Sequence, residues 1–152
     1  MRISVSSDMV EPVARALVAG LRDRGHEVVA HGALRPGDDP QWAACSQAAA
    51  RDVAEGRSDQ AVVCCWTGTG ASIAANKVPG IRAALCTDAY TADGARRWND
   101  ANVLALGLRL TSEPLLNEIL DAWFAGSPSE DAEDRENVAR VGCLDHARTT
   151  GP

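Results

Sequence analysis

The stretch Ala61-Val62-Val63-Cys64-Cys65-Trp66-Thr67-Gly68-Thr69-Gly70-Ala71-Ser72-Ile73-Ala74-Ala75-Asn76-Lys77 decides the fold. An apolar run ends in a thiol, a Gly/Thr turn follows, and a helix of small residues begins at once. We expect this order to place Cys65 beside backbone N–H donors at a helix start, where negative charge is stabilised and a thiol ionises more readily. A base beside such donors suits proton abstraction next to a carbonyl. The structural alternative is an ordinary buried cysteine, which is common in protein cores.

Outward from this stretch, strand-like and helix-like segments alternate along the chain. Strands are expected at 2–6, 27–30, 60–65, 82–86 and 103–106, and helices at 11–24, 41–55, 71–77, 91–98, 113–125 and 130–144. This alternation predicts a parallel α/β sheet with right-handed crossovers and helices on both faces. We expect one Rossmann-like three-layer domain over residues 1–147, with strand order 2-1-3-4-5, and a disordered tail over 148–152.

The expected strand order also predicts where a ligand binds. In doubly wound sheets the ligand lies outside the carboxyl ends of the strands, where the strand order reverses. Here that point falls between the first and third strands. Asp8 comes after the first strand, and Cys65 is the last residue of the third. The sequence therefore predicts that these two side chains meet in a ligand cleft.

Composition narrows the classes of partner. A net charge of −6 and a pI near 5.0 disfavour nucleic acid and anionic membranes as partners. No apolar run approaches the roughly 20 residues of a membrane span. The first residues look like a strand rather than a signal peptide, so we expect a cytoplasmic protein.

The cysteines and histidines do not form a metal-binding pattern. The five cysteines are Cys45, Cys64, Cys65, Cys86 and Cys143, and the histidines are His26, His31 and His146. Their spacing matches no zinc motif, so we expect reduced thiols, structural histidines and no metal. Adjacent Cys64 and Cys65 should point to opposite faces of a strand. A redox sensor built from this pair is a weaker alternative, because their disulfide would be strained.

Three segments make the chain resemble the type B ribose-5-phosphate isomerases and the related galactose-6-phosphate isomerase subunits. These segments are 65–77, 78–86 and 99–107, and Asp8 and Asp39-Pro40 also fit the pattern. The resemblance covers nearly the whole chain. It implies an aldose–ketose isomerase that works through an enediolate, without a metal or organic cofactor. It also implies a homodimer or homotetramer, with Asn99 and its neighbours entering the partner's site.

The resemblance assigns roles to residues of this sequence. It implies that Cys65 shuttles a proton between C1 and C2 of an open-chain sugar, while Thr67 hydrogen-bonds the thiolate or the reacting oxygens. Asp8 and Asn99 match positions that hold sugar hydroxyls and the carbonyl. The enediolate would be held by the backbone amides of Gly68, Thr69, Gly70, Ala71 and Ser72. The structural alternatives are turn formation for Thr67 and helix capping for Asn99.

Several positions depart from the family. Met9 and Trp98 stand where the family carries histidines, the second of which opens the sugar ring, and Trp66 replaces a common glycine. An indole can stack on a sugar ring but cannot exchange a proton as imidazole does. Trp66 would equally suit a core or dimer interface. Trp42 and Trp123 lie on amphipathic helices and are expected in the core.

The expected phosphate-binding segment is acidic in this chain. Glu133, Asp134 and Asn137 fall where the family has arginine and histidine, and only Arg109 is retained. A phosphate favours bidentate arginine, and each charge-assisted bond is worth roughly 1.5–3 kcal/mol. We therefore expect poor binding of sugar phosphates and an unphosphorylated or modified sugar as substrate. A shifted helix register would let Arg135 or Arg140 compensate, and a simple solvated helix face is the structural alternative.

Parts of the sequence fit two further functions. Gly68-Thr69-Gly70 resembles the start of a dinucleotide-binding fingerprint, but Ile73 occupies the place of its third glycine and the motif follows the third strand. A non-catalytic sugar-binding relative is the other alternative. Such a binder has no evident need of a thiol at the anion-binding turn, so the sequence favours the enzyme.

Overall fold

The computed structural model describes residues 1–147, so the tail expected at 148–152 lies outside the described residues. Within the described range, strands and helices alternate as expected until the last two helices. The elements are β1 (Arg2–Ser7), α1 (Pro12–Asp23), β2 (Glu27–Gly32), α2 (Trp42–Ala54), β3 (Gln60–Cys65), α3 (Thr69–Ala75), β4 (Ala83–Leu85), α4 (Ala89–Asn99), β5 (Val103–Gly107), α5 (Glu113–Ala125) and α6 (Ala132–Ala147). Among the described residues, no helix has the length and apolar character to cross a membrane.

The five strands form one parallel sheet in the order β2-β1-β3-β5-β4. The expected order 2-1-3-4-5 is wrong for the last two strands. All five residues of β5 are buried, whereas the three residues of β4 are only partly buried. The longer, more apolar strand therefore takes the interior position and the short one takes the edge. The predicted pairing of β1 with β3 is confirmed, and it is this pairing that positions the candidate site.

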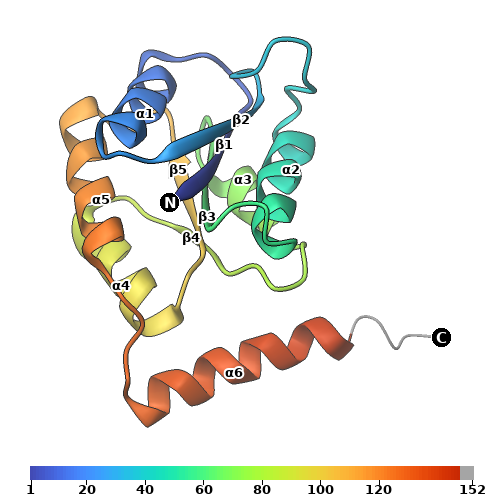
Figure 1. The fold of residues 1–152 in the computed structure, drawn as a ribbon, viewed down its shortest axis with the longest axis vertical. Coiled ribbons are helices and arrows are strands. Elements are labelled where there is room, and N and C mark those ends of the chain that lie inside the picture. Colours follow the sequence, from blue (N-terminus) through green and yellow to red (C-terminus); the bar gives the residue numbers. More distant parts are fainter. Residues whose placement is uncertain (148–152) are drawn as a thin grey trace.

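Helices cover both faces of the sheet and create two cores (Figure 1). Side chains of α1, α4 and α5 pack on one face together with Cys64, and those of α2 and α3 pack on the other together with Cys65. The predicted opposite orientation of the two cysteines is thus confirmed. Trp123 is 1% exposed, as expected for a core residue. Trp42 is 45% exposed, so the prediction that it belongs to the core is wrong.

The described histidines have structural surroundings. His31 Nε2 lies 2.7 Å from Asp52 Oδ2, and Ser4 and Arg57 also donate to that carboxylate. Burial acts to raise the pKa of Asp52, but these hydrogen bonds outweigh it and hold the pKa below its usual value. His26 stacks on an aromatic ring of α5. Among the described residues, no group of three or more His, Cys, Asp or Glu side chains could hold a metal.

Helix α6 lies outside the three layers and extends along one end of the molecule (Figure 1). One hydrogen bond, from the Gly80 amide to Asp145 Oδ2 at 2.8 Å, ties its far end to the segment before β4. Val141 and Leu144 are exposed on it. The helix therefore offers side chains to something other than the core of its own domain.

Candidate active site

The first group of candidate residues lies at the carboxyl ends of β1 and β3. Ser7 of β1 pairs with Cys64 of the parallel strand β3. The next residues, Asp8 and Cys65, therefore lie side by side where the two strands end, as the sequence predicts. Cys65 is 6% exposed, and the backbone amide of Ala71 donates to its Sγ at 3.4 Å. The helix α3 begins at Thr69, two residues earlier than expected. The thiol therefore lies against a backbone donor of the helix that follows it.

The turn between Cys65 and α3 is shaped by Gly68. Its φ is +77°, in the left-handed region, and a Cβ there would lie 2.5 Å from Leu85 Cδ1 and 2.8 Å from the Gly107 amide nitrogen. Two backbone hydrogen bonds also join the start of this turn to the residues after β5. Leu108 N donates to Cys65 O and Arg109 N donates to Trp66 O, each at 3.0 Å. This packing fixes the turn and brings the backbone of Arg109 beside the site.

Replacing Gly68 with alanine should destabilise the protein more than the same change at Gly80. Gly80 has a similar φ of +81°, but nothing lies within 4 Å of its added Cβ. The left-handed backbone costs roughly 1–2 kcal/mol at either position, and overpacking adds about 1–3 kcal/mol at Gly68 alone. Urea unfolding of Gly68→Ala and Gly80→Ala measures the difference. Equal losses of unfolding free energy would show that the turn is not packed in this way.

Two hydroxyl groups lie on the exposed side of the turn. Thr67 Oγ1 and Thr69 Oγ1 are 2.7 Å apart, and either can donate. Both residues are exposed, whereas Gly68 between them is buried. The pair can accept a proton at one oxygen and release one at the other, which suits a reaction that moves a proton between two sugar oxygens.

Asp8 provides an acceptor beside the thiol. Its Oδ1 is buried and has no hydrogen-bond partner among the described residues. Burial raises the pKa of Asp8 and outweighs a hydrogen bond to its own backbone. An unsatisfied buried carboxylate oxygen is costly, so a hydroxyl donor from a ligand would bind favourably here.

The adjacent cysteine is chemically inert by comparison. Burial raises the pKa of the Cys64 thiol far above its ordinary value, with the nearby Cys65 and Asp8 acting in the same direction. Cys64 therefore stays protonated and faces the core shared with α1 and α5. Of the two adjacent thiols, only Cys65 is positioned for acid–base chemistry.

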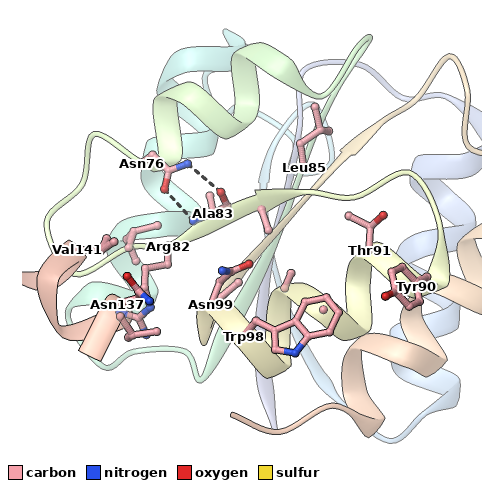
Figure 2. Close-up of a pocket in the computed structure, with 16 residues that line it drawn as sticks. Asn76, Arg82, Ala83, Leu85, Tyr90, Thr91, Trp98, Asn99, Asn137 and Val141 are labelled. Atoms are coloured by element: carbon pink, nitrogen blue, oxygen red, sulfur yellow. Dashed lines mark hydrogen bonds between the residues drawn. The ribbon is translucent and has the colours of Figure 1, made fainter. Parts of the chain in front are cut away.

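The second group of candidate residues lines a cavity of about 590 Å³ between β4, α4 and α6. Figure 2 shows Trp98, Asn99 and Asn137 around this cavity. Asn76 bonds both the amide and the carbonyl of Ala83 at 2.8 Å and thereby covers part of the exposed edge of β4. The cavity is thus built from the edge strand β4, one face of α4 and the middle of α6.

Within one chain, Trp98 and Asn99 lie toward the amino ends of the strands, whereas Asp8 and Cys65 lie at their carboxyl ends. Ala61 N, near the start of β3, donates to Asn102 O at 3.2 Å, whereas Cys65 closes the same strand. A strand of five or six residues spans roughly 17–20 Å. The structure therefore brings Asp8, Cys65 and residues 67–72 together but keeps Trp98 and Asn99 away from them.

The remaining candidates are also placed by the structure. The side chain of Asn137 lines the cavity with Trp98, and its Nδ2 donates to the carbonyl of Glu133 one turn earlier. Glu133 itself is exposed and does not line the cavity. Arg109 is exposed after β5, with its backbone held to the loop that follows Cys65. Glu133 and Asn137 therefore do not join Cys65 within a single chain.

Sequence reasoning missed one residue of the site. Trp42, the first residue of α2, lies against Gly70 of α3, because a Cβ at Gly70 would be 3.0–3.3 Å from three atoms of its indole. Helical spacing alone assigned it to the core. Its position at the start of a helix could have indicated this. A helix that follows a parallel strand begins near the carboxyl ends of the strands, where ligands bind.

Comparison with known proteins identifies the family of this chain. The family model described as Ribose/Galactose Isomerase matches residues 3–141. The chain is 40% identical over 134 residues to ribose-5-phosphate isomerase B of Escherichia coli, covering 87% of each. It is 34% identical over 126 residues to D-erythrulose-4-phosphate isomerase of Pectobacterium atrosepticum, covering 83% of this chain and 82% of that one.

A solved structure gives the same result for the whole fold. Ribose-5-phosphate isomerase B of Clostridium thermocellum superposes with a TM-score of 0.88 at 35% identity, covering 97% of this chain and 99% of that one. The family match spans most of the sequence, and the relatives share both sequence and fold with it. This chain belongs to the ribose/galactose isomerase family of aldose–ketose isomerases.

Proposed function

We propose that this chain interconverts an aldose and a ketose with Cys65 as both acid and base, and that it uses no metal or organic cofactor. The observation that supports this most is the Cys65 thiol, which receives the Ala71 amide at 3.4 Å beside the unpartnered Oδ1 of Asp8. The amide favours negative charge on sulfur, and the carboxylate oxygen is ready to accept a sugar hydroxyl. Together they provide a base and a binding group at the edge of the sheet where ligands bind.

The proposed reaction conserves every atom of the sugar. The Cys65 thiolate removes the proton from C2 of the open-chain aldose, and the electron pair moves to the carbonyl oxygen to give an enediolate. Backbone amides of residues 68–72 stabilise this oxyanion. Cys65 returns a proton to C1, while the proton of the C2 hydroxyl passes to the oxygen on C1. The hydroxyl pair of Thr67 and Thr69 is suited to that second transfer.

We further propose that the complete site is shared between two copies of the chain. Trp98, Asn99 and Asn137 surround one cavity, yet they lie at the edge of the sheet opposite Cys65. The position of α6 outside the layers supports this arrangement, because its exposed side chains are free to reach a second copy (Figure 1). A symmetric dimer would then contain two equivalent sites.

The cavity is suited to a neutral end of the substrate. Among the described residues of α6, those lining it are Asn137, Val138 and Val141, so this helix supplies no cation there. Arg82 also lines the cavity, but its guanidinium is occupied by Asp100 at 3.0 Å. A phosphate dianion would lack the bidentate partner it prefers. We therefore propose an unphosphorylated or differently substituted sugar as substrate.

Arg135 and Arg140, the two arginines that a shifted helix register would offer to a phosphate, lie elsewhere. Arg140 pairs with Glu136 at 2.5 Å. Arg135 lines a separate hollow together with Asp134 and Asp100. Neither lies among the residues that line the cavity with Asn137. Neither arginine therefore adds positive charge to the side of α6 that faces the cavity.

A substrate panel tests the proposal. Free ribose and erythrose are compared with ribose 5-phosphate and erythrulose 4-phosphate, and the isomers are followed by NMR. Because a charge-assisted arginine bond is worth roughly 1.5–3 kcal/mol, its absence should remove the preference of about tenfold or more that such a bond gives the esters, so kcat/KM for the free sugars should equal or exceed that for the esters. Higher kcat/KM for the phosphate esters would contradict the neutral cavity.

A gain-of-charge variant is the matched control. In Asn137→Arg a guanidinium enters the same cavity without touching the Cys65 loop. If the cavity holds the far end of the substrate, kcat/KM for ribose 5-phosphate should rise by about tenfold or more, while that for free ribose should not. Equal changes for both sugars would show that the cavity does not contact that end.

A further inference from the structure

Trp42 is an exposed indole that packs against Gly70 of α3, the helix that follows Cys65. It begins α2 directly after a turn in which Asp39 Oδ1 accepts the Gln41 amide at 2.9 Å. It is 45% exposed, and its ring lies against the backbone of Gly70, where an added Cβ would meet three ring atoms at 3.0–3.3 Å. The turn before the helix and the contact at Gly70 hold the ring in one place. Trp42 is thus an apolar surface at the edge of the sheet that carries the site.

The neighbours of this indole are groups that take part in the proposed reaction. Ala71, the residue after Gly70, donates its amide to Cys65 Sγ at 3.4 Å. Cys45 lies one turn along α2 from Trp42. Burial raises the pKa of the Cys45 thiol to about 11, and the charge of Asp8 acts in the same direction. An added Cβ at Gly32 would lie 2.6 Å from Ser7 O and 2.7 Å from Cys45 Cβ, so the first turn of α2 lies close to the end of β1, just before Asp8.

We propose that Trp42 shields the enediolate and the Cys65 thiol from bulk water during proton transfer, an inference that rests on the proposed isomerase function. The indole presents a flat apolar surface with a single N–H donor, so it excludes water without competing for the amides. Hydrogen bonds from backbone amides to an oxyanion are stronger where water is excluded. The contact between Trp42 and Gly70 puts that apolar surface against the turn that carries these donors.

Shielding has a measurable chemical consequence. Once Cys65 has taken the proton from C2, that proton either returns to the sugar at C1 or exchanges with solvent. Access of water to the thiol sets the ratio of these two fates. The ratio reports on water at the site, and a loss of overall stability does not change it.

The experiment uses a substrate deuterated at C2 in ordinary water and measures how much deuterium appears at C1 of the product in a single turnover. Opening the site to water should raise the ratio of exchange to transfer by at least about fivefold in Trp42→Ala, with a larger effect on kcat than on KM. Trp42→Phe, which keeps a planar apolar ring, should retain the wild-type ratio. An unchanged ratio in Trp42→Ala would overturn the proposal.

A double-mutant cycle with Gly70 tests the contact itself. In Gly70→Ala the new methyl group must displace the indole, so the ratio should rise. In the Trp42→Ala background the same change meets no indole and should add nothing. Equal effects of Gly70→Ala in both backgrounds would show that the methyl group acts on the amides rather than through Trp42.

Alkylation provides a readout that needs no turnover. Among the described cysteines Cys143 is exposed and the others are buried, so the measurement is made in a Cys143→Ser background with peptide mapping of Cys65. Iodoacetamide should modify Cys65 at least about fivefold faster in Trp42→Ala, because the thiol becomes more accessible. Absence of turnover by the wild type with every sugar would contradict the proposed function. Turnover combined with unchanged exchange and alkylation in Trp42→Ala would overturn the shielding role alone.

Discussion

The Cys65→Ala variant is expected to lower kcat for aldose–ketose interconversion by about 10²–10⁴-fold, the usual contribution of a positioned acid–base group. The reason is geometric, because this thiol lies at the end of β3 with the Ala71 amide on its sulfur and no described group replaces it there. Steady-state kinetics with the best sugar of the panel measures the loss. Affinity for that sugar should change little, since Asp8 and the amides remain.

The adjacent cysteine provides the control. Cys64→Ala removes a thiol of similar burial on the opposite face of the same strand, so it should lower stability without a comparable loss of kcat. If Cys65→Ala kept full activity, the proposed acid–base role would be wrong. A wild type that binds sugars without turning them over would instead favour the non-catalytic relative.

The second large effect is expected when two inactive variants are mixed. Cys65→Ala lacks the base and Asn99→Ala lacks a residue that we assign to the partner's site, so each should be nearly inactive alone. After co-expression, half of randomly assembled dimers are mixed, and one of their two sites carries neither change. Activity should return to about one quarter of the wild-type value.

A matched pair distinguishes a shared site from simple rescue of folding. Cys65→Ala co-expressed with Asp8→Ala should not recover activity, because both residues belong to the same chain's half of the site. Recovery limited to the pair with Asn99→Ala is the expected result. No recovery in that pair, with mixed dimers demonstrated by mass spectrometry, would contradict the shared site.

The fold could be predicted largely because its signals are local. β3 was predicted with its observed bounds, since the apolar run from Ala61 to Cys65 ends at a Gly/Thr turn, and α5 was also predicted with its observed bounds. The order of β4 and β5 was not, because each alone resembles a buried strand. Their places depend on which one buries more surface in the assembled sheet, and that is a property of the whole core.

Some residues of the candidate site could likewise be predicted from local sequence, and others could not. Cys65 and residues 67–72 are consecutive in sequence, so one strand and one turn were enough to predict their arrangement. Asn99 ends α4, just before the Asn102 carbonyl that accepts the Ala61 amide at the start of β3. In the proposed shared site, a second copy brings Asn99 to the thiol. Trp42 escaped detection because amphipathic spacing says which face of a helix is apolar, not which end lies at the ligand.

The redox alternative loses its structural basis. Cys64 and Cys65 point into different cores on opposite faces of the sheet. A disulfide between them would need both sulfurs on the same side of the strand, which would break its pairing with β1 and β5. The opposed orientation instead separates Cys64, whose pKa burial raises, from Cys65, the thiol that we propose as acid and base.

Proton transfer by Cys65 is tested most directly by turnover in deuterated water. The purified protein is incubated with the best sugar of the panel, and NMR follows deuterium at C1 and C2. We predict that deuterium enters the carbon that gains a proton as the isomer forms, and that neither event occurs with Cys65→Ala. Isomerisation or incorporation of deuterium that persists in Cys65→Ala would contradict an enediolate mechanism with this thiol as the base.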